Sequence, residues 1–465
     1  MATVKKRGKS YSVVYTYLNE VGEKKQKWET YKTKKEADKR RVEIEGTMAN
    51  GTFISPNNQT VEDFLKDFVS LYGEKKWGIS MYDSSTGLIR NYIVPIIGQV
   101  PIQAFNARTV DVFVQKLQKT KPVHCKWRKA ATSYLTPASI EKIIKLLRCA
   151  FQQAVRWELI GKNPFDDPIL PKTRYKPRDI WDADMIRKAL DACKDNQLYV
   201  AMNLAFACSL RVGEILGLTW NNVHIEDEDI AADNAWIFID KELERAHIDT
   251  IERLGERDDI LKVFDPIMSA SNKTRLVLKR PKTDSSVRRI WLPKTLAYIL
   301  REWKNVQEAQ KRFLGEEYQD FDLVVALENG RPSDNRNIEK SFSKLREAAG
   351  LPRVCFHSLR HSSTTYKLKL NHGDLKATQG DTGHAQVDMI TKIYAHILDE
   401  DRKVNAQKFE SAFYSVTDLR TVTPPPEKEN PGIDIAQLID GLQKSPELAN
   451  TLLTVLQAQK SANLN

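Results

Sequence analysis

Hydrophobic and polar positions alternate at the start of the chain. Tyr11, Val13 and Tyr15 recur at every second position, which predicts a β-strand, and residues 24–31 can return as a second strand after a polar turn. Thr33 is followed three residues later by a glutamate, the capping-box pattern that marks the beginning of a helix. The pattern therefore predicts a small sheet followed by one charged helix.

Apolar residues recur at helical spacing in the next part of the chain. The clearest helix is predicted after Thr136, with a proline at its first position and an end before Gly161. Its apolar stripe consists of Ile140, Ile143, Ile144, Leu147, Phe151 and Val155. Shorter helices are predicted over the following stretches: 60–68, 81–92 and 107–117. This part of the chain is predicted to be an all-α domain.

Helical and strand patterns are mixed in the remainder, up to about residue 413. A helix is predicted around 201–216, and the predicted strands are 235–239, 275–278 and 287–292. A proline-rich break then precedes an amphipathic tail, which is typical of a packing or partner surface. The prediction is a multidomain α+β protein: a small sheet and helix over 1–52, an all-α domain over 58–170, a mixed, mainly helical domain with a small antiparallel sheet over 178–415, and a linker with a helical tail over 416–465.

Charge adds a candidate partner to this picture. The 465-residue chain has a formal net charge of +11, and its first 50 residues hold 13 Lys and Arg against 7 Asp and Glu. A concentrated positive end suits a polyanion such as nucleic acid, although many basic proteins bind none. No apolar run reaches the about 18 residues of a membrane span, and the basic start lacks the apolar region of a signal peptide. Five scattered cysteines are expected to be reduced thiols.

Two arginine-containing segments carry candidate chemistry. Arg211, in SLRVGEILGLTW, is predicted at a helix start with Glu214 on the same face, a spacing that is commonly a structural ion pair. His357 and Arg360, in FHSLRHSSTTY, are three apart and are predicted to share a helical face. A guanidinium can bind a phosphoryl oxygen while an imidazole transfers a proton. His361 could pair with His357 on a metal, but the zincin glutamate is missing, so no metal is expected.

Two further segments add a phenol and a lysine. Tyr394 follows His384 by ten residues in TGHAQVDMITKIYAHILDE. A phenol has a pKa of about 10 and needs cationic neighbours to attack phosphorus at neutral pH; otherwise Tyr394 is simply a helix tyrosine. Tyr366 is a rival nucleophile, but it follows Arg360 closely. Lys282, in KRPKTDSSVRRIWLP, lies between two predicted strands, where a lysine is usually just solvated.

Together, in their order along the chain, these segments resemble the tyrosine recombinase (phage-type integrase) family. The resemblance implies that Arg211 and Arg360 clamp the scissile phosphate and that His357 acts as general acid or base. It implies that Lys282 protonates the leaving 5′ oxygen and that His384 donates a hydrogen bond to the phosphate. Tyr394 would be the nucleophile.

The resemblance also implies an organisation and a set of partners. Residues 1–52 would be an arm-type DNA-binding domain, 58–170 a core-binding domain and 178–415 the catalytic domain. Cleavage through a 3′-phosphotyrosine, without nucleotide, metal or other cofactor, would integrate and excise a mobile element. Expected partners are double-stranded DNA with core-type and arm-type sites, three further copies in a homotetramer, an excisionase and a host DNA-bending protein, all in the bacterial cytoplasm. Residues 241–273 depart from the family, because this connection is longer and more charged than usual.

Three alternatives remain open. A type IB topoisomerase shares the chemistry but acts as a monomer, so strand exchange between two DNA sites distinguishes it. A non-catalytic DNA-binding regulator would tolerate the loss of Tyr394. A general basic interaction protein would need none of the signature residues.

Overall fold

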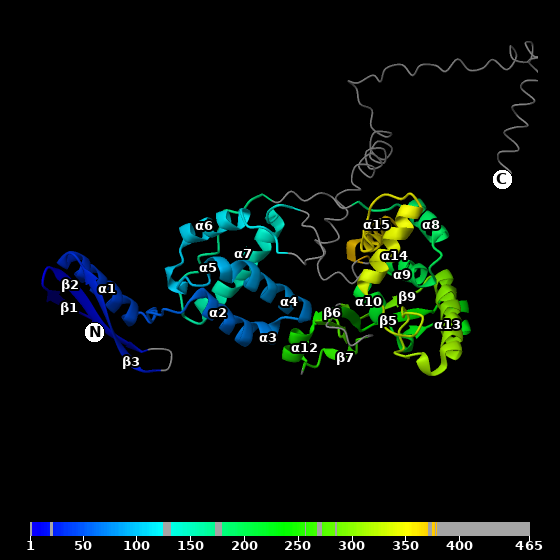
Figure 1. Cartoon of the computed structure of the whole chain (residues 1–465), viewed down its shortest axis with the longest axis horizontal. Helices are drawn as coiled ribbons and strands as arrows, with labels where there is room; N and C mark the ends of the chain where they lie inside the picture. Colours follow the sequence, from blue (N-terminus) through cyan, green and yellow to red (C-terminus); the bar gives the residue numbers. More distant parts are fainter. Residues whose placement is uncertain are drawn as a thin grey trace, which may run out of the picture. The chain divides into compact units, whose positions relative to one another are not determined.

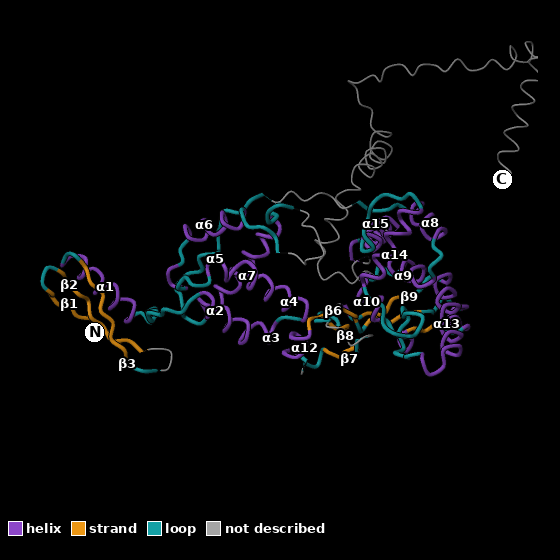
Figure 2. Tube along the Cα trace, viewed as in Figure 1, coloured by secondary structure: helices purple, strands orange, loops and turns teal. Residues whose placement is uncertain are grey.

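The protein is described here by a computed structural model. It describes residues 2–18, 22–123, 132–172, 179–255, 257–266, 272–283, 286–370, 374–376 and 378. The chain divides into two compact units, Met1–Tyr394 and Ala395–Asn465, so that all described residues lie in the first. Figure 1 shows the chain coloured from its N-terminus, and Figure 2 shows the same view coloured by secondary structure. No helix in the described ranges is long and apolar enough to span a bilayer.

The N-terminal elements form the predicted sheet and helix. Strands β1 (Ala2–Arg7), β2 (Ser10–Leu18) and β3 (Lys24–Tyr31) are antiparallel with β2 in the centre, and α1 (Lys34–Ala49) packs on one face (Figure 1). Val13 and Tyr15 are buried against Ala37 of this helix, because alternate residues of a strand share one face. The Thr33 side chain caps α1 and Glu36 completes the capping box, as predicted. Strand β1 was not among the predicted elements.

Helices form the next hydrophobic cluster. Its longer helices are α2 (Val61–Phe68), α4 (Ile79–Leu88), α6 (Ala107–Gln118) and α7 (Pro137–Arg156). Shorter helices lie between them: α3 (Glu74–Lys76), α5 (Val94–Ile97), and two π-helical turns, Val69–Gly73 and Ile89–Ile93. Helix α7 begins at Pro137 behind the Thr136 cap, and its predicted stripe is buried apart from Val155, which is partly buried. The predicted all-α character of this region is confirmed.

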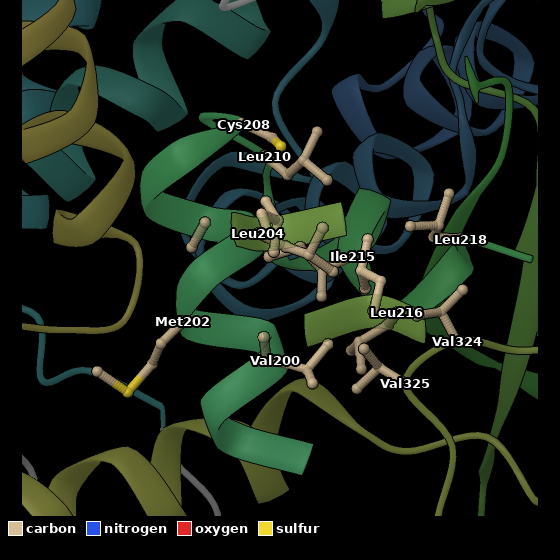
Figure 3. Packing of buried hydrophobic residues seen from close by; sticks show 14 of the residues in the cluster. Val200, Met202, Leu204, Cys208, Leu210, Ile215, Leu216, Leu218, Val324 and Val325 are labelled. Carbon is tan, nitrogen blue, oxygen red and sulfur yellow. The ribbon is translucent and has the colours of Figure 1, made fainter. Parts of the chain in front are cut away.

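A larger cluster combines helices with a three-stranded sheet of order β4-β5-β9. The strands are β4 (Val223–His224), β5 (Trp236–Ile239) and β9 (Arg288–Trp291), the last two close to the predicted ranges. The helices are α8 (Ala183–Ala192), α9 (Asn196–Ala207), α10 (Val212–Gly217), α11 (Asp227–Ala231), α13 (Lys294–Leu314), α14 (Asn335–Ala348) and α15 (Ser358–Leu370). Figure 3 shows how Val200 and Leu204 of α9 pack near Ile215 and Leu216 of α10 within this core.

The single helix predicted around 201–216 is wrong, because the chain leaves the helix between α9 and α10, whereas the predicted helix start at Arg211 is confirmed. Ser209 has a φ of 53°, in the left-handed region, and Arg211 is extended at the N-cap of α10. Buried Ser209 shares a hydrogen bond of 2.6 Å with the Ser363 hydroxyl of α15, and its carbonyl accepts from Arg360. Contacts with a helix far along the sequence therefore stabilise the break, and helical periodicity could not reveal it.

The long charged connection of residues 241–273 folds into structure of its own. Strands β6 (Glu242–His247), β7 (Ile260–Phe264) and β8 (Thr274–Lys279) form a second antiparallel sheet of order β6-β8-β7, and helix α12 (Ile248–Leu254) joins β6 to β7 (Figure 2). We call residues 242–279 the insertion. Of these elements, the sequence predicted only the strand at 275–278. The insertion lies between β5 and β9 in sequence and contacts elements on both sides, as described below.

Candidate functional site

A buried carboxylate organises the arginines predicted from the sequence. Glu214, in the first turn of α10, is 1% exposed and accepts hydrogen bonds from the Arg211 backbone at 3.0 Å and from the Arg211 side chain at 2.6 Å. Arg288 of β9 donates to the same carboxylate at 3.1 Å, and Arg360 Nη1 lies 4.0 Å from it. Burial alone would raise the pKa of Glu214, but Arg288 and Arg211 together hold it below its usual range. We call these three arginines and Glu214 the arginine cluster.

The arginine cluster holds more positive than negative charge. Its four groups, three guanidinium groups and one carboxylate, together carry a formal charge of 3 − 1 = +2. Arg360 is 2% exposed, and burial together with the charges of Arg211 and Arg288 lowers its pKa to about 9. The group still carries its charge at neutral pH, because that value lies well above 7. Such an excess of buried positive charge favours an anion that reaches the cluster.

Arg211 connects the cluster to an open cavity. Its side chain is 35% exposed, and it lines a cavity of about 720 Å³ together with His357, Glu244, Arg245 and other residues. Arg211 reaches the cavity because the break after α9 places it at the start of α10 rather than within a continuous helix. An anion in this cavity would meet the exposed edge of the cluster.

His357 lies where α15 begins and also lines the cavity. It precedes the first residue of the helix, whereas Arg360 is in the first turn, so both come from one short segment. Its ring makes an edge-to-face contact with His361, with centroids 4.8 Å apart. The structure therefore brings Arg211, His357 and Arg360 together from two segments about 150 residues apart.

Of the other predicted site residues, Lys282 lies within the described ranges. Lys282 is exposed in the segment between β8 and β9, and it does not line the cavity as the described residues define it. His384 and Tyr394 lie outside the described residues. Their roles stay predictions from the sequence.

Arg288 is a member of the cluster that the sequence reasoning missed. It is 9% exposed, and besides Glu214 it donates to the Ser286 carbonyl at 2.9 Å. A signal was present, because Arg288 shares the inward face of its strand with Ile290 and Leu292, both buried. A charged residue on an apolar strand face predicts a buried ion pair.

Comparison with known proteins gives the family. Residues 180–401 match the model of the phage integrase family. The chain is 25% identical over 386 residues to a protein named "Tyrosine recombinase XerC-like" from Caldanaerobacter subterraneus subsp. tengcongensis, covering 81% of this chain and 88% of that protein. It is 23% identical over 334 residues to the ICEBs1 integrase of Bacillus subtilis, covering 71% and 77% of the two chains.

A solved structure shares the fold. The integrase of the Tn1549 transposon, in complex with a circular intermediate DNA, superimposes with a TM-score of 0.56 over 76% of this chain and 99% of that chain, at 17% identity. At this identity the likeness concerns the fold alone, and it agrees with the multidomain α+β architecture predicted from the sequence. Residues 180–401 therefore match the phage integrase family, and over most of its length the chain is similar to proteins named tyrosine recombinase and integrase.

Proposed function

We propose that this protein is a site-specific DNA recombinase, which cleaves and rejoins DNA to integrate and excise a mobile element. The observation that carries the proposal is the arginine cluster with its excess positive charge at the edge of a cavity that Arg211 and His357 line. A scissile phosphodiester is an anion of suitable size and charge for such a site. The names of its relatives, tyrosine recombinase and integrase, support this choice.

In the proposed reaction, arginines bind the phosphate and a histidine handles a proton. Arg211 and Arg360 would bind the nonbridging oxygens, where charge grows as phosphorus becomes five-coordinate. His357 would exchange a proton with the attacking or leaving oxygen. Arg288 would reach the phosphate only through Glu214, so we assign it a positioning role.

Tyr394 would supply the nucleophile. Its phenolate oxygen would attack phosphorus, the bond to the 5′ oxygen would break, and a 3′-phosphotyrosine would form. Lys282 would give its proton to the leaving 5′ oxygen, and His384 would donate a hydrogen bond to the phosphate. A 5′ hydroxyl of a second duplex would then reverse the step. The phosphotyrosine conserves the phosphodiester energy, so the reaction consumes no nucleotide.

We propose a division of labour along the chain. The N-terminal sheet over 1–52 would bind arm-type DNA, the helical part over 58–170 core-type DNA, and 178–415 would carry out cleavage. Each of the first two has its own hydrophobic cluster, and the first 50 residues are strongly basic. Residues 416–465 would form a linker and tail that packs on a neighbouring subunit. Four copies on two duplexes, an excisionase and a host DNA-bending protein complete the proposal, with the bacterial cytoplasm as its location.

Trapping a covalent intermediate tests the proposal. A suicide substrate made from the ends of the element carries a nick beside the cleavage point, so the 5′ product diffuses away and the adduct accumulates. We expect wild type to form a protein–DNA adduct, and Tyr394→Phe to form none while still binding DNA. Tyr366→Phe is the matched control, because Tyr366 is a 43% exposed tyrosine on α15 that packs near Phe206.

Each alternative has its own result. An adduct that persists in Tyr394→Phe and disappears in Tyr366→Phe would move the nucleophile to α15. Relaxation of supercoiled DNA by a monomer, without exchange between two sites, would favour a topoisomerase. Site-specific binding without any adduct in wild type would favour a regulator.

A further inference from the structure

The insertion is attached to the helical part of the protein. Asp83 of α4 accepts hydrogen bonds from the His247 backbone at 3.2 Å and from the Thr250 hydroxyl of α12. Thr250 is 4% exposed, so solvent cannot easily replace this bond. An ion pair of 3.3 Å joins Arg253 to Glu74 at the margin of the contact (Figure 1 shows α12 beside α3 and α4).

Apolar burial extends the same contact. Ala246, Leu254 and Val277 of the insertion are buried in the hydrophobic cluster of the helical part, not in that of the β4-β5-β9 sheet. Arg257 also donates to the Trp77 carbonyl at 2.6 Å. Buried side chains and hydrogen bonds together make this a packed interface rather than a chance approach of two surfaces.

On its other side the insertion packs against α10, the helix that carries Arg211 and Glu214. A Cβ atom on Gly217 would lie 2.8 Å from Glu242 Cα, and one on Gly213 would lie 3.2 Å from the Leu243 carbonyl oxygen. Backbone therefore contacts backbone, with no flexible side chain between β6 and α10. Because α10 has only six residues, a displacement of β6 would also move Arg211, which is the N-cap residue of α10.

We propose that the insertion positions Arg211. Through the insertion, binding of the helical part to DNA would affect the geometry of the arginine cluster. The inference rests on the proposed recombinase function. Strand β6 contacts α10 on one side and continues into α12, which is held by Asp83 of α4 on the other. Asp83, Thr250 and Gly217 are thus positioning residues: they touch no DNA in this proposal and act through Arg211.

Thr250→Val tests the contact with a change of one buried hydroxyl. The variant keeps the size and charge of the side chain but removes the hydrogen bond to Asp83. In single-turnover cleavage at saturating DNA we expect the rate to fall on the order of tenfold, with DNA affinity within about threefold of wild type. Asp166→Ala is the matched control, an exposed carboxylate of the helical part outside the contact, and should cleave like wild type.

A double-mutant cycle tests the route through Arg211. If Thr250 acts by positioning that guanidinium, adding Thr250→Val to Arg211→Lys should change the rate by less than about twofold. Gly217→Ala probes the other end of the insertion and should resemble Thr250→Val. Melting curves of all variants identify any that fail to fold, and Thr250→Val decides the matter if Gly217→Ala does not fold.

The outcomes separate this inference from the function on which it rests. If wild type forms the adduct but Thr250→Val cleaves equally fast at saturating DNA, the insertion does not position the site. If the effects of Thr250→Val and Arg211→Lys simply multiply, the coupling through Arg211 is wrong. If affinity falls and the rate does not, the insertion is only a tether. Absence of any adduct in wild type would instead overturn the proposed function.

Discussion

Two glutamates, half-buried Glu29 and buried Glu214, organise surroundings of different charge balance. Glu29 of β3 accepts hydrogen bonds from the hydroxyls of Tyr15 at 2.6 Å and Tyr31 at 2.8 Å, and from Arg40 at 2.9 Å. Arg40 pairs with Glu29 at 2.9 Å and with exposed Glu43 at 3.1 Å, so these groups carry no excess positive charge, whereas Glu214 faces three guanidinium groups. The Glu29 network is complete in itself and stabilises the N-terminal sheet. The four groups of the arginine cluster carry net positive charge, which suits an added anion.

The pKa shifts express the same difference. Burial opposes the charge of Glu29, but hydrogen bonds from Arg40 and the two tyrosines lower its pKa to about 2. Burial and the bond to Glu29 raise the pKa of Tyr15. In the arginine cluster the group whose charged form is destabilised is a cation, because burial and the charges of Arg211 and Arg288 lower the pKa of Arg360. Opposite charges stabilise the ionised form of Glu29, whereas burial among like charges destabilises the ionised form of Arg360.

The largest expected effect is on cleavage. Arg211→Ala removes the cavity-facing guanidinium of the cluster, and we expect the single-turnover cleavage rate to fall about 10²–10³-fold at saturating DNA. Arg40→Ala removes the guanidinium of the balanced network, and on a substrate with core sites alone it should cleave at the wild-type rate. Similar losses in both variants would show that charge balance does not distinguish the two regions.

The second largest expected effect is the loss of stability when the carboxylate of Glu214 or Glu29 is removed. Glu214→Gln leaves buried Arg288 and Arg360 without their counter-charge, and we expect the free energy of unfolding to fall by about 3 kcal/mol. Glu29→Gln leaves a single, partly exposed arginine unpaired and should cost less, about 1–2 kcal/mol. Urea denaturation of both variants measures the difference. A larger loss in Glu29→Gln would reverse our ranking.

Acid should destabilise the N-terminal sheet by protonating Glu29. Its folded pKa, about 2, lies below the ordinary glutamate value of 4.5, so its stabilisation is complete above pH 4.5 and is lost as pH falls towards 2. We expect a contribution of about 2 kcal/mol, reduced for partial exposure. The NMR signal of the Trp28 indole, on the same strand, reports the loss. Glu29→Gln should abolish this part of the pH dependence, and an unchanged profile would contradict the assignment.

The smallest expected effect is anion binding without DNA. Sulfate should stabilise wild type by about 1.4 kcal/mol when its free concentration is ten times its Kd. Arg211→Gln should lose most of this stabilisation, whereas Arg40→Gln should retain it. Thermal melting in sulfate, against chloride at equal ionic strength, makes the measurement. Equal stabilisation of both variants would mean that sulfate binds elsewhere.

The sequence predicted local features well. Alternation along β2 and the capping box at Thr33 determine the first sheet and helix, because both signals arise from neighbouring residues. The Glu29 network could not be predicted, since Tyr15 and Arg40 are 14 and 11 residues away and meet only after folding. The sequence placed Arg211 at a helix start and marked residues 241–273 as unusually long and charged. The backbone conformation at Ser209 and the fold of the insertion were not predicted, because each depends on a distant partner, α15 in one case and α4 in the other.

The site was predicted in part. Local sequence motifs identified Arg211, His357 and Arg360 as candidates, and the structure brings these residues together. Arg288 was overlooked because its role depends on which face of β9 turns inward. Lys282 is exposed and is not among the described residues that line the cavity, and the assignments of His384 and Tyr394 still depend on the sequence alone.

The bond between Arg360 and the Ser209 carbonyl has a consequence for inheritance and engineering. A main-chain carbonyl cannot be mutated away, so natural variation can alter this link only by changing the arginine or by reshaping the backbone around Ser209. If either segment is replaced by that of a homologue, we therefore expect an active protein only when the residue at position 209 keeps the left-handed backbone conformation. Chimaeras joined between the two segments should be inactive more often than those that inherit both from one parent.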